Sequence, residues 1–417
     1  MSTTLEKSRA NVSDIVKFDF LTATKPAFDN EVTRKEIART FISDTVTVPT
    51  REMYTYATLA SLGDDVYHEP TTSALEAHIA KITGKEAGLF MPSGTASNQI
   101  ALRASLKQPP YSVLCDHRAH VYKYEAGGLG FHSGAAVTAV VPANGKPSSD
   151  AFSLWVLMSI PGHHLTLEDV KTNITLGTDV HFATTEVVAL ENTLNGTIFP
   201  QDEVIAISDW VHSHGIKMHL DGARIWHVAA ETGTSLEELC QPFDSVSLCF
   251  SKGLGAPIGS CLVGTNQLIQ RARRLRKLFG GGMRQTGILS GSAAYALTYN
   301  FPLLPRVHTL ARKLEQGLEA IGVDITSRAE TCMVFFDAHS IGSDYNEIST
   351  RAKQLPDPIH LAASSRLVVH VQTSEEAVDD LLALVAQIAK EKKDAGFVKP
   401  AHQANGVVRD VYVRASR

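Results

Sequence analysis

A lysine follows directly on a short apolar segment in the second half of the 417-residue chain. The segment Val246–Phe250 is apolar and partly β-branched and predicts a buried strand, while Gly253 and Pro257 argue against a simple helix after it. Burying an ammonium group without a partner is costly, so a lysine such as Lys252 at the end of a core strand is unusual. A desolvated lysine loses its proton readily and becomes an amine nucleophile that can form a Schiff base. The simpler alternative is a loop lysine that reaches solvent.

A carboxylate occupies a similar position at the end of another apolar segment. Asp221 follows Lys217–Leu220, a predicted strand in which an unpaired carboxylate would be costly to bury. The N–H of a pyridinium ring is a suitable partner, because this ion pair keeps the ring of pyridoxal phosphate (PLP) an electron sink. The alternative is that Asp221 caps a helix that begins near Gly222. Arg224 could reach the phenolic oxygen of such a cofactor or the carboxylate of a substrate.

A possible phosphate site lies earlier in the chain. Residues Leu89–Asn98 have the pattern of a strand, a tight turn and the start of a helix. In the turn Ser93–Thr95, Gly94 and Thr95 would present backbone N–H groups and a hydroxyl at the helix N-terminus, where phosphate groups bind. Such turns commonly do no more than cap a helix, so the phosphate assignment depends on the presence of Lys252 and Asp221 elsewhere in the chain.

Other polar side chains could complete such a site. His120 could stack on the cofactor ring, and Asn192 could hydrogen-bond the ring oxygen or shape a turn. His117 and His120 could instead be a metal pair, but no third ligand of clear spacing is present, so we expect no metal. The glycines of Gly127–Gly130 lack the strand-to-helix context of a dinucleotide-binding motif.

A parallel sheet would bring these residues together. Between residues 88 and 263 short apolar segments alternate with helical or loop segments, which predicts an α/β domain with a mostly parallel sheet. The expected strands are Gly88–Met91, Ser112–Cys115, Ala136–Val141, Val187–Leu190, Lys217–Leu220 and Val246–Phe250. Ligands of such sheets bind beyond the carboxyl ends of the strands. Ser93, Glu191, Asp221 and Lys252 all lie at or just after those ends.

The pattern changes on either side of this body. We expect residues 1–38 to be a partly disordered arm, residues 39–300 a large domain, residues 301–392 a smaller C-terminal α+β domain and residues 393–417 a loose tail. The small domain is predicted to contain helices Val307–Ile321 and Thr373–Lys392 and strands Met333–Phe336 and Leu367–Val371. A Thr373/Glu376 capping box is expected to open the last helix. The apolar insertion at 147–162 does not fit the alternation and is too short to span a bilayer.

Composition limits the classes of function. A hydrophobic content of 44% allows a large core, and a net charge of −5 gives no basic face for nucleic acid. The five cysteines are scattered and odd in number, which is typical of a reduced intracellular protein. The first 39 residues lack a signal-peptide core. We therefore expect a cytoplasmic protein with a small-molecule substrate and without nucleic-acid or membrane partners.

In their order along the chain, these motifs resemble those of the L-threonine aldolase family of PLP enzymes. The resemblance covers roughly residues 40–390 and is greatest to the fungal branch. The motifs are Ser-Asp-Thr-Val-Thr (43–47), Asp-Asp-Val-Tyr-x-Glu (64–69), Pro-Ser-Gly-Thr-x-x-Asn (92–98), Ala-His with Glu-Ala-Gly-Gly (119–128), Glu-Asn-Thr (191–193), Leu-Asp-Gly-Ala-Arg (220–224), Ser-Lys-Gly-Leu-Gly-Ala-Pro (251–257) and Gly-Gly-Gly-Met-Arg-Gln (280–285). The resemblance implies PLP fold type I, the aspartate aminotransferase-like architecture.

The resemblance also implies roles for individual residues. Lys252 would bind PLP covalently, Asp221 would pair with its pyridine nitrogen, and His120 would stack on its ring; these three are the expected catalytic residues. The remaining expected contacts to the cofactor come from Ser93, Gly94, Thr95, Asn192 and Arg224. The substrate carboxylate would be bound by Ser43, Arg224 and Arg366.

Three further residues imply an oligomer. Tyr67, Lys277 and Arg284 match positions that line a site shared between subunits in that family, so we expect a homodimer or homotetramer. The sequence also departs from the family pattern. Leu194 replaces a histidine that contacts the substrate hydroxyl in bacterial members, Pro70 replaces an Asp, and Ser364-Ser365 replaces a Gly-Gly pair before Arg366.

The implied reaction is retro-aldol cleavage of L-threonine, L-allo-threonine and related β-hydroxy-α-amino acids to glycine and an aldehyde. His120, His68 or a bound water would accept the hydroxyl proton. An alternative is a PLP-dependent alanine racemase of the same fold that serves peptide natural-product biosynthesis. A third possibility is a non-catalytic protein of this fold, which the retention of both Lys252 and Asp221 argues against.

Overall fold

The computed structural model describes residues 30–143 and 164–399, together with residues 3, 4, 6, 7 and 16–18. The apolar insertion predicted at 147–162 lies outside the described residues, as do much of the predicted arm and most of the predicted tail. The described part of the arm includes the helix α3 (Asn30–Ala38). Among the described residues, no helix has the length and apolar character needed to cross a membrane.

A large sheet of seven strands has the order β1-β7-β6-β5-β4-β2-β3. The strands are β1 (Ala87–Met91), β2 (Tyr111–Asp116), β3 (Ala136–Val140), β4 (Thr184–Glu191), β5 (Lys217–Gly222), β6 (Ser245–Cys249) and β7 (Ser260–Gly264). The neighbouring pairs from β6 to β3 are all parallel, whereas β7 runs antiparallel to both β1 and β6. The predicted mostly parallel sheet is confirmed, with β7 as a strand that the sequence analysis did not identify.

Helices cover both faces of this sheet, which explains why its strands are apolar on both sides. One face carries α5 (Pro70–Ile82), α10 (Leu167–Asn173), α11 (Gln201–Ser213), α12 (Ile225–Thr232) and α13 (Leu236–Cys240). The other face carries α6 (Gly94–Ser105), α8 (Gly128–Ser133) and α14 (Asn266–Leu278). Along β4, Val188 and Leu190 pack into the first layer while Val187 and Ala189 pack into the second, as the period of a strand requires.

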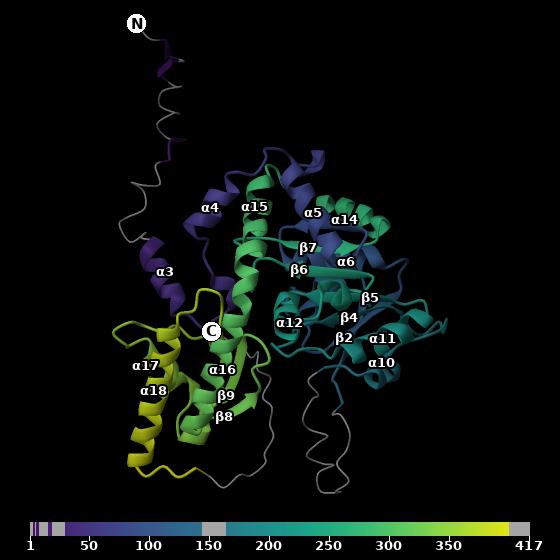
Figure 1. Ribbon diagram of the computed structural model, residues 1–417. Coiled ribbons are helices and arrows are strands. Elements are labelled where there is room, and N and C mark those ends of the chain that lie inside the picture. Colours follow the sequence, from purple (N-terminus) through teal and green to yellow (C-terminus); the bar gives the residue numbers. More distant parts are fainter. Residues whose placement is uncertain (1–2, 5, 8–15, 19–29, 144–163, 400–417) are drawn as a thin grey trace.

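A second core surrounds a small antiparallel sheet with the order β10-β9-β8. Its strands are β8 (Asp324–Ser327), β9 (Met333–Asp337) and β10 (Arg366–Val368), and its helices are α16 (Leu304–Ile321), α17 (Tyr345–Ala352) and α18 (Glu375–Asp394). Helices α4 (Arg51–Ala57) and α15 (Gly287–Tyr295) pack together, and α15 leads into α16 beside the large sheet (Figure 1). Phe41 belongs to this second core, where its backbone bonds to His360 and Val368.

Two details of the small sheet region differ from the prediction. The last helix begins at Glu375 and is capped by Ser374, whose side chain accepts a hydrogen bond from the N–H of Ala377. The predicted Thr373/Glu376 capping box is therefore wrong by one residue, because the Thr373 hydroxyl instead accepts from the N–H of His370. Strand β10 is also shorter than the predicted Leu367–Val371.

Candidate active site

Lys252 lies just beyond the carboxyl end of β6, as the sequence predicts. The strand is buried throughout, and Ala256 N–H donates back to the carbonyl of Phe250, which closes the turn that carries Lys252. The lysine itself is half-buried. Its positive charge favours the ionised forms of Asp44 and Glu191, which belong to other segments of the chain. Lys252 therefore faces a space that these carboxyl groups share.

Asp221 is buried at the carboxyl end of β5, one strand away from Lys252. Its carboxylate accepts hydrogen bonds from the Asn98 side chain at 2.8 Å and from the Ala223 N–H at 3.1 Å. The same Asn98 amide nitrogen donates to Glu125 at 2.9 Å, and the Asn98 oxygen lies 3.1 Å from Nε2 of His219. Asn98 therefore fixes Asp221 in a buried polar network.

His120, at the start of α7 (His120–Lys123), joins the same network. Its Nδ1 lies 2.9 Å from Glu125, and its backbone N–H donates to Glu191 at 2.7 Å. Burial alone would lower the pKa of His120, but the hydrogen bond to Glu125 and the charge of Asp221 outweigh it and raise that pKa. Burial raises the pKa of Glu191 to about 7, and the charge of Asp221 adds to this effect. Glu191 can thus gain or lose a proton near neutral pH.

The turn Ser93–Thr95 forms the N-terminus of α6, as predicted. The Ser93 hydroxyl accepts from the N–H of Ala96, and the Ser93 carbonyl accepts from the Ser260 hydroxyl. A side chain at Gly94 would bring a Cβ atom within 2.6 Å of the Cys249 sulfur, so this turn packs closely against the end of β6. The first N–H groups of a helix have no acceptor within it, so the turn presents anion-binding groups beside the segment that carries Lys252.

Asp44 and Arg224 form a buried ion pair that the sequence analysis did not identify. Arg224 donates to both carboxylate oxygens of Asp44, at 2.8 and 2.6 Å. Burial would raise the pKa of Asp44, but the charge of Arg224 and its hydrogen bonds outweigh burial and lower that pKa to about 2. Ser43 caps the turn at Asp44, and Arg366 donates to the carbonyl of Ile42 at 3.4 Å. The structure thus brings Ser43, Arg224 and Arg366 together around one segment.

Three of the predicted substrate residues lie on the surface instead. Tyr67 and Lys277 are exposed, and Arg284 is exposed and ion-paired with Asp64. The charges of Arg284 and Lys277 both lower the pKa of Asp64, which shows that these residues lie close together. His68, a predicted proton acceptor, is exposed as well. Among the described residues, no hydrogen bond or ion pair links this surface group to Lys252 of the same chain.

Asn192 is buried with its backbone N–H bonded to the carbonyl of Asp221. Its side-chain oxygen accepts from the N–H of Phe199 at 3.3 Å, which corresponds to the turn-shaping alternative. Leu194 is buried close by. Nδ1 of His117 lies 3.3 Å from Asp116, and Nδ1 of His120 lies 2.9 Å from Glu125. In each of these two histidines the Nδ1 atom therefore contacts a carboxylate.

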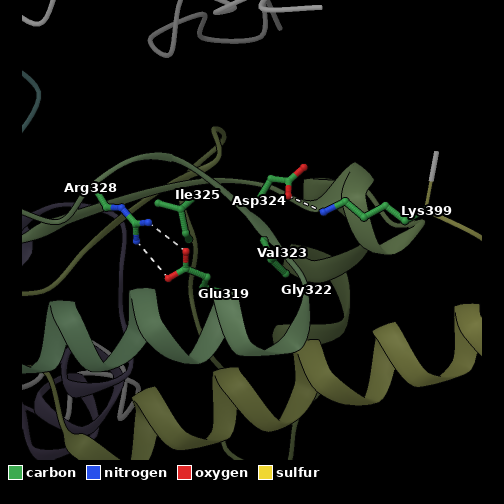
Figure 2. A pocket seen from close by; sticks show the side chains of 7 residues that line it. All are labelled: Glu319, Gly322, Val323, Asp324, Ile325, Arg328 and Lys399. Carbon is green, nitrogen blue, oxygen red and sulfur yellow. Dashed lines mark hydrogen bonds and ion pairs between the residues drawn. The ribbon is translucent and has the colours of Figure 1, made fainter. Parts of the chain in front are cut away.

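A separate cavity of about 420 Å³ lies where α16 meets β8, and none of the predicted site residues lines it (Figure 2). Its lining comprises Glu319, Gly322, Val323, Asp324, Ile325, Arg328 and Lys399. Figure 2 shows that Arg328 pairs with Glu319 and Lys399 with Asp324, so these charged groups are already paired within the cavity.

Comparison with known proteins accounts for this arrangement. The model of the family described as "Beta-eliminating lyase" matches residues 40–340. The chain belongs to the beta-eliminating lyase family. Within this family it is similar to the low-specificity L-threonine aldolase of Candida albicans, with 44% identity over 345 residues that cover 82% of this chain and 87% of that protein. The corresponding enzyme of Saccharomyces cerevisiae is 40% identical over 85% of this chain and 87% of that protein.

Other members of the beta-eliminating lyase family and other solved structures extend the comparison. Alanine racemase TOXG of Cochliobolus carbonum is 34% identical over 84% of this chain and 87% of that protein. The structure of a threonine aldolase from Leishmania major has a TM-score of 0.68 at 18% identity and covers 84% of this chain and 99% of that chain. A serine palmitoyltransferase from S. paucimobilis, solved with bound PLP, has a TM-score of 0.61 at 14% identity over 85% of this chain and 88% of that chain. The predicted PLP fold type I is therefore confirmed.

The close packing next to Lys252 depends on the absence of a side chain at residue 253. A Cβ atom at Gly253 would overlap Nε2 of the buried His227 ring. We expect Gly253→Ala to destabilise the fold by about 1 to 3 kcal/mol, because one of these two buried groups must move. Urea unfolding of both proteins measures this, with Gly130→Ala as a control at a glycine that has neither a positive φ nor an atom near its would-be side chain. Equal unfolding midpoints for Gly253→Ala and the native protein would contradict the close contact.

The buried imidazole of His219 predicts a pH dependence of stability. Burial lowers its pKa to about 4, whereas an unfolded histidine titrates near pH 6.5. Between these values only the unfolded chain binds the proton, so this contribution to stability is complete above about pH 6.5 and falls as the pH falls toward 4. By pH 5 the loss is about 2 kcal/mol.

We expect the variant His219→Gln, whose amide can still bond to Asn98 and Ser245, to lose less stability than the native protein between pH 7 and pH 5. The measurement is the urea midpoint at each pH for both proteins. An identical pH dependence would show that His219 does not contribute to it.

Proposed function

We propose that this protein uses PLP to cleave β-hydroxy-α-amino acids such as L-threonine and L-allo-threonine into glycine and an aldehyde. The observation that carries the proposal is the arrangement of Lys252 and Asp221 at the carboxyl ends of adjacent strands, in a chain 44% identical to a low-specificity L-threonine aldolase. Membership of the beta-eliminating lyase family supports the same class of reaction.

The residues present fit the cofactor. The half-buried Lys252 supplies an amine, the buried carboxylate of Asp221 can accept the pyridinium N–H, and the turn Ser93–Thr95 offers N–H groups to a phosphate. When bound, PLP would supply an electron sink for the bond that breaks at the substrate Cα. Asn98 would keep the carboxylate of Asp221 oriented toward the ring nitrogen, since its amide occupies one carboxylate oxygen.

Arg224 would bind the substrate carboxylate, assisted by Arg366 and Ser43. Asp44 accepts from two nitrogens of Arg224 and so holds the plane of the guanidinium in one orientation. A substrate held at its carboxylate has its Cα–Cβ bond fixed relative to Lys252, and such positioning accounts for a large part of the rate in comparable reactions.

His120 would accept the proton of the β-hydroxyl. A neutral His120 that donates from Nδ1 to Glu125 carries no proton on Nε2, which leaves that nitrogen as the base. The raised pKa of His120 makes it a stronger base. Glu191 accepts from the backbone N–H of the same histidine and so anchors the segment that carries it.

An exposed apolar surface supports a homodimer with shared sites. Tyr54, Leu59, Leu62 and Tyr67 belong to one segment of the chain and are 53 to 89% exposed, and exposed apolar surface commonly forms an interface. Tyr67 lies near Arg284, because after the hydrogen bond and charge of Asp64 it adds to the raised pKa of that residue. In a dimer, the group Tyr67, Lys277 and Arg284 would complete the site of the partner subunit. A cytoplasmic location stays a prediction of the sequence.

The direct test is incubation of the PLP-loaded protein with L-threonine, L-allo-threonine and, separately, L-alanine. We expect acetaldehyde and glycine in equal amounts from the first two, and Lys252→Ala should lower this turnover by about 10³-fold or more because it removes the amine nucleophile. Lys313→Gln, at an exposed ion pair on α16, is the matched control. Full activity of Lys252→Ala would contradict the proposal, and D-alanine without acetaldehyde would favour the racemase reaction named by the relative from Cochliobolus carbonum.

Mixing two inactive variants tests the shared site. We expect Lys252→Ala and Arg284→Ala each to be inactive alone, because each damages every site of its own homodimer. After dissociation and reassociation of the mixture, a hybrid dimer contains one intact site, so about a quarter of the native activity should return. The assay is acetaldehyde release before and after mixing. Failure to recover activity, with hybrid formation shown by differently tagged subunits, would place Arg284 outside the shared site.

A further inference from the structure

A series of four polar side chains leads from the protein surface to the site. Arg312 donates to Glu231 at 2.7 Å, and the other oxygen of Glu231 lies 2.6 Å from Nδ1 of His308. Nε2 of His308 lies 2.8 Å from Nδ1 of His227. The two histidines are fully buried, whereas Glu231 and Arg312 are partly exposed. The series crosses between helices, since His227 and Glu231 belong to α12 and the other two residues to α16.

The inner end of this series faces the ion pair of Asp44 and Arg224. Nε2 of His227, a carboxylate oxygen of Asp44 and the sulfur of Cys332 all lie within 4.8 Å of one another. Among the described residues, Nε2 of His227 has no hydrogen-bond partner. His227 is also three residues after Arg224 in the chain, so the two side chains are fixed to the same end of α12.

The hydrogen bonds determine which nitrogen of His227 carries the proton. Burial lowers the pKa of His227 to about 3 and also lowers that of His308, so at neutral pH each ring is uncharged and has one N–H. Nδ1 of His308 makes no well-aligned hydrogen bond, but it lies 2.6 Å from the carboxylate of Glu231, which is paired with Arg312 and has no proton to donate. At that distance the single proton of the His308 ring belongs on Nδ1. Nε2 of His308 is then an acceptor, and His227 must donate from Nδ1. Nε2 of His227 is left without a proton.

This tautomer matters because of what the other one would do. With a proton on Nε2, His227 would direct a donor at a carboxylate oxygen of Asp44 that lies no more than 4.8 Å away, and both oxygens of Asp44 accept from Arg224. The new donor would compete with Arg224 for the carboxylate and release the guanidinium from its fixed plane. Without that proton, His227 is an acceptor and leaves Asp44 entirely to Arg224.

We propose that Glu231 and His308 fix His227 in its Nδ1-protonated tautomer, and that these three positioning residues thereby keep Asp44 bound to Arg224. The inference rests on the proposed function to the extent that Arg224 binds the substrate carboxylate. Helix α16 packs in the core of the small sheet and α12 in the core of the large sheet. The same series of contacts therefore makes the orientation of Arg224 depend on the relative position of the two cores.

Two substitutions of His308 test this directly. In His308→Gln, the amide oxygen can accept from His227 and the amide nitrogen can donate to Glu231, so the tautomer of His227 is preserved. In His308→Leu both bonds are lost, and His227 is free to carry its proton on Nε2. We expect KM for L-threonine to rise about 10-fold in His308→Leu, with kcat within about 2-fold of the native value, since a weakened carboxylate contact affects binding. His308→Gln and the control Lys313→Gln should keep the native KM.

A second readout does not depend on activity. Long-range ¹H–¹⁵N spectra of protein labelled at histidine distinguish the two tautomers, and the His227 signals are those lost in His227→Gln. We expect an unprotonated Nε2 in the native protein and in His308→Gln, and a protonated Nε2 in His308→Leu. Glu231→Ala, which removes the acceptor near the surface, should shift both KM and the His227 signals in the same direction if His308→Leu does not fold.

Particular results would overturn the inference. A protonated Nε2 of His227 in the native protein would do so, and so would an unchanged KM in His308→Leu or equal impairment of His308→Gln and His308→Leu. If the native protein does not cleave L-threonine, it is the proposed function that fails, and the spectra still decide whether His308 and Glu231 fix the tautomer.

Discussion

The buried charge of Asp221 is the constraint on which the rest of the site depends. A carboxylate at this depth must have donors, and Asn98 supplies one from α6, the helix that begins at the Ser93–Thr95 turn. Burial and then the charge of Asp221 raise the pKa of Glu191, and the hydrogen bond to Glu125 and then the charge of Asp221 raise the pKa of His120. The site is therefore a coupled unit, in which one buried carboxylate influences two neighbouring acid–base groups and is itself oriented by the helix that begins at the turn Ser93–Thr95.

A second buried pair, Asp44 with Arg224, lies where the two cores meet. Phe41 anchors the chain in the core of the small sheet only three residues before Asp44, while Arg224 directly precedes α12 on the large sheet. The proposed binding of a carboxylate at Arg224 would therefore be sensitive to the relative position of the two cores. This is also why residues distant in sequence, such as Ser43 and Arg366, lie at one place.

The sequence was sufficient to predict the parts of the structure that depend on local pattern. Apolar segments predicted β1 to β6, and the polar residues after them predicted the positions of Lys252, Asp221 and the turn Ser93–Thr95. The sequence could not show that Asn98 and Asp44 bind Asp221 and Arg224, because those bonds join segments more than a hundred residues apart. Ser374 and Thr373 are both good caps, and only the observed backbone shows which of them starts α18. The sequence analysis did not predict β7, because Ser260–Gly264 follows closely on a glycine-rich turn.

The position of β7 has a consequence for how the protein is made. β1 enters the sheet only through β7, so residues 87–91, although synthesised early, pair with residues 260–264. Contacts of such large sequence separation form slowly. Until they form, the backbone N–H and C=O groups of β1 have no partner strand. The turn Ser93–Thr95 that follows β1 is thus completed only after the segment bearing Lys252 has left the ribosome. The candidate active site is among the last parts of the large sheet to assemble, and a truncated chain that ends before β7 has no means of forming it.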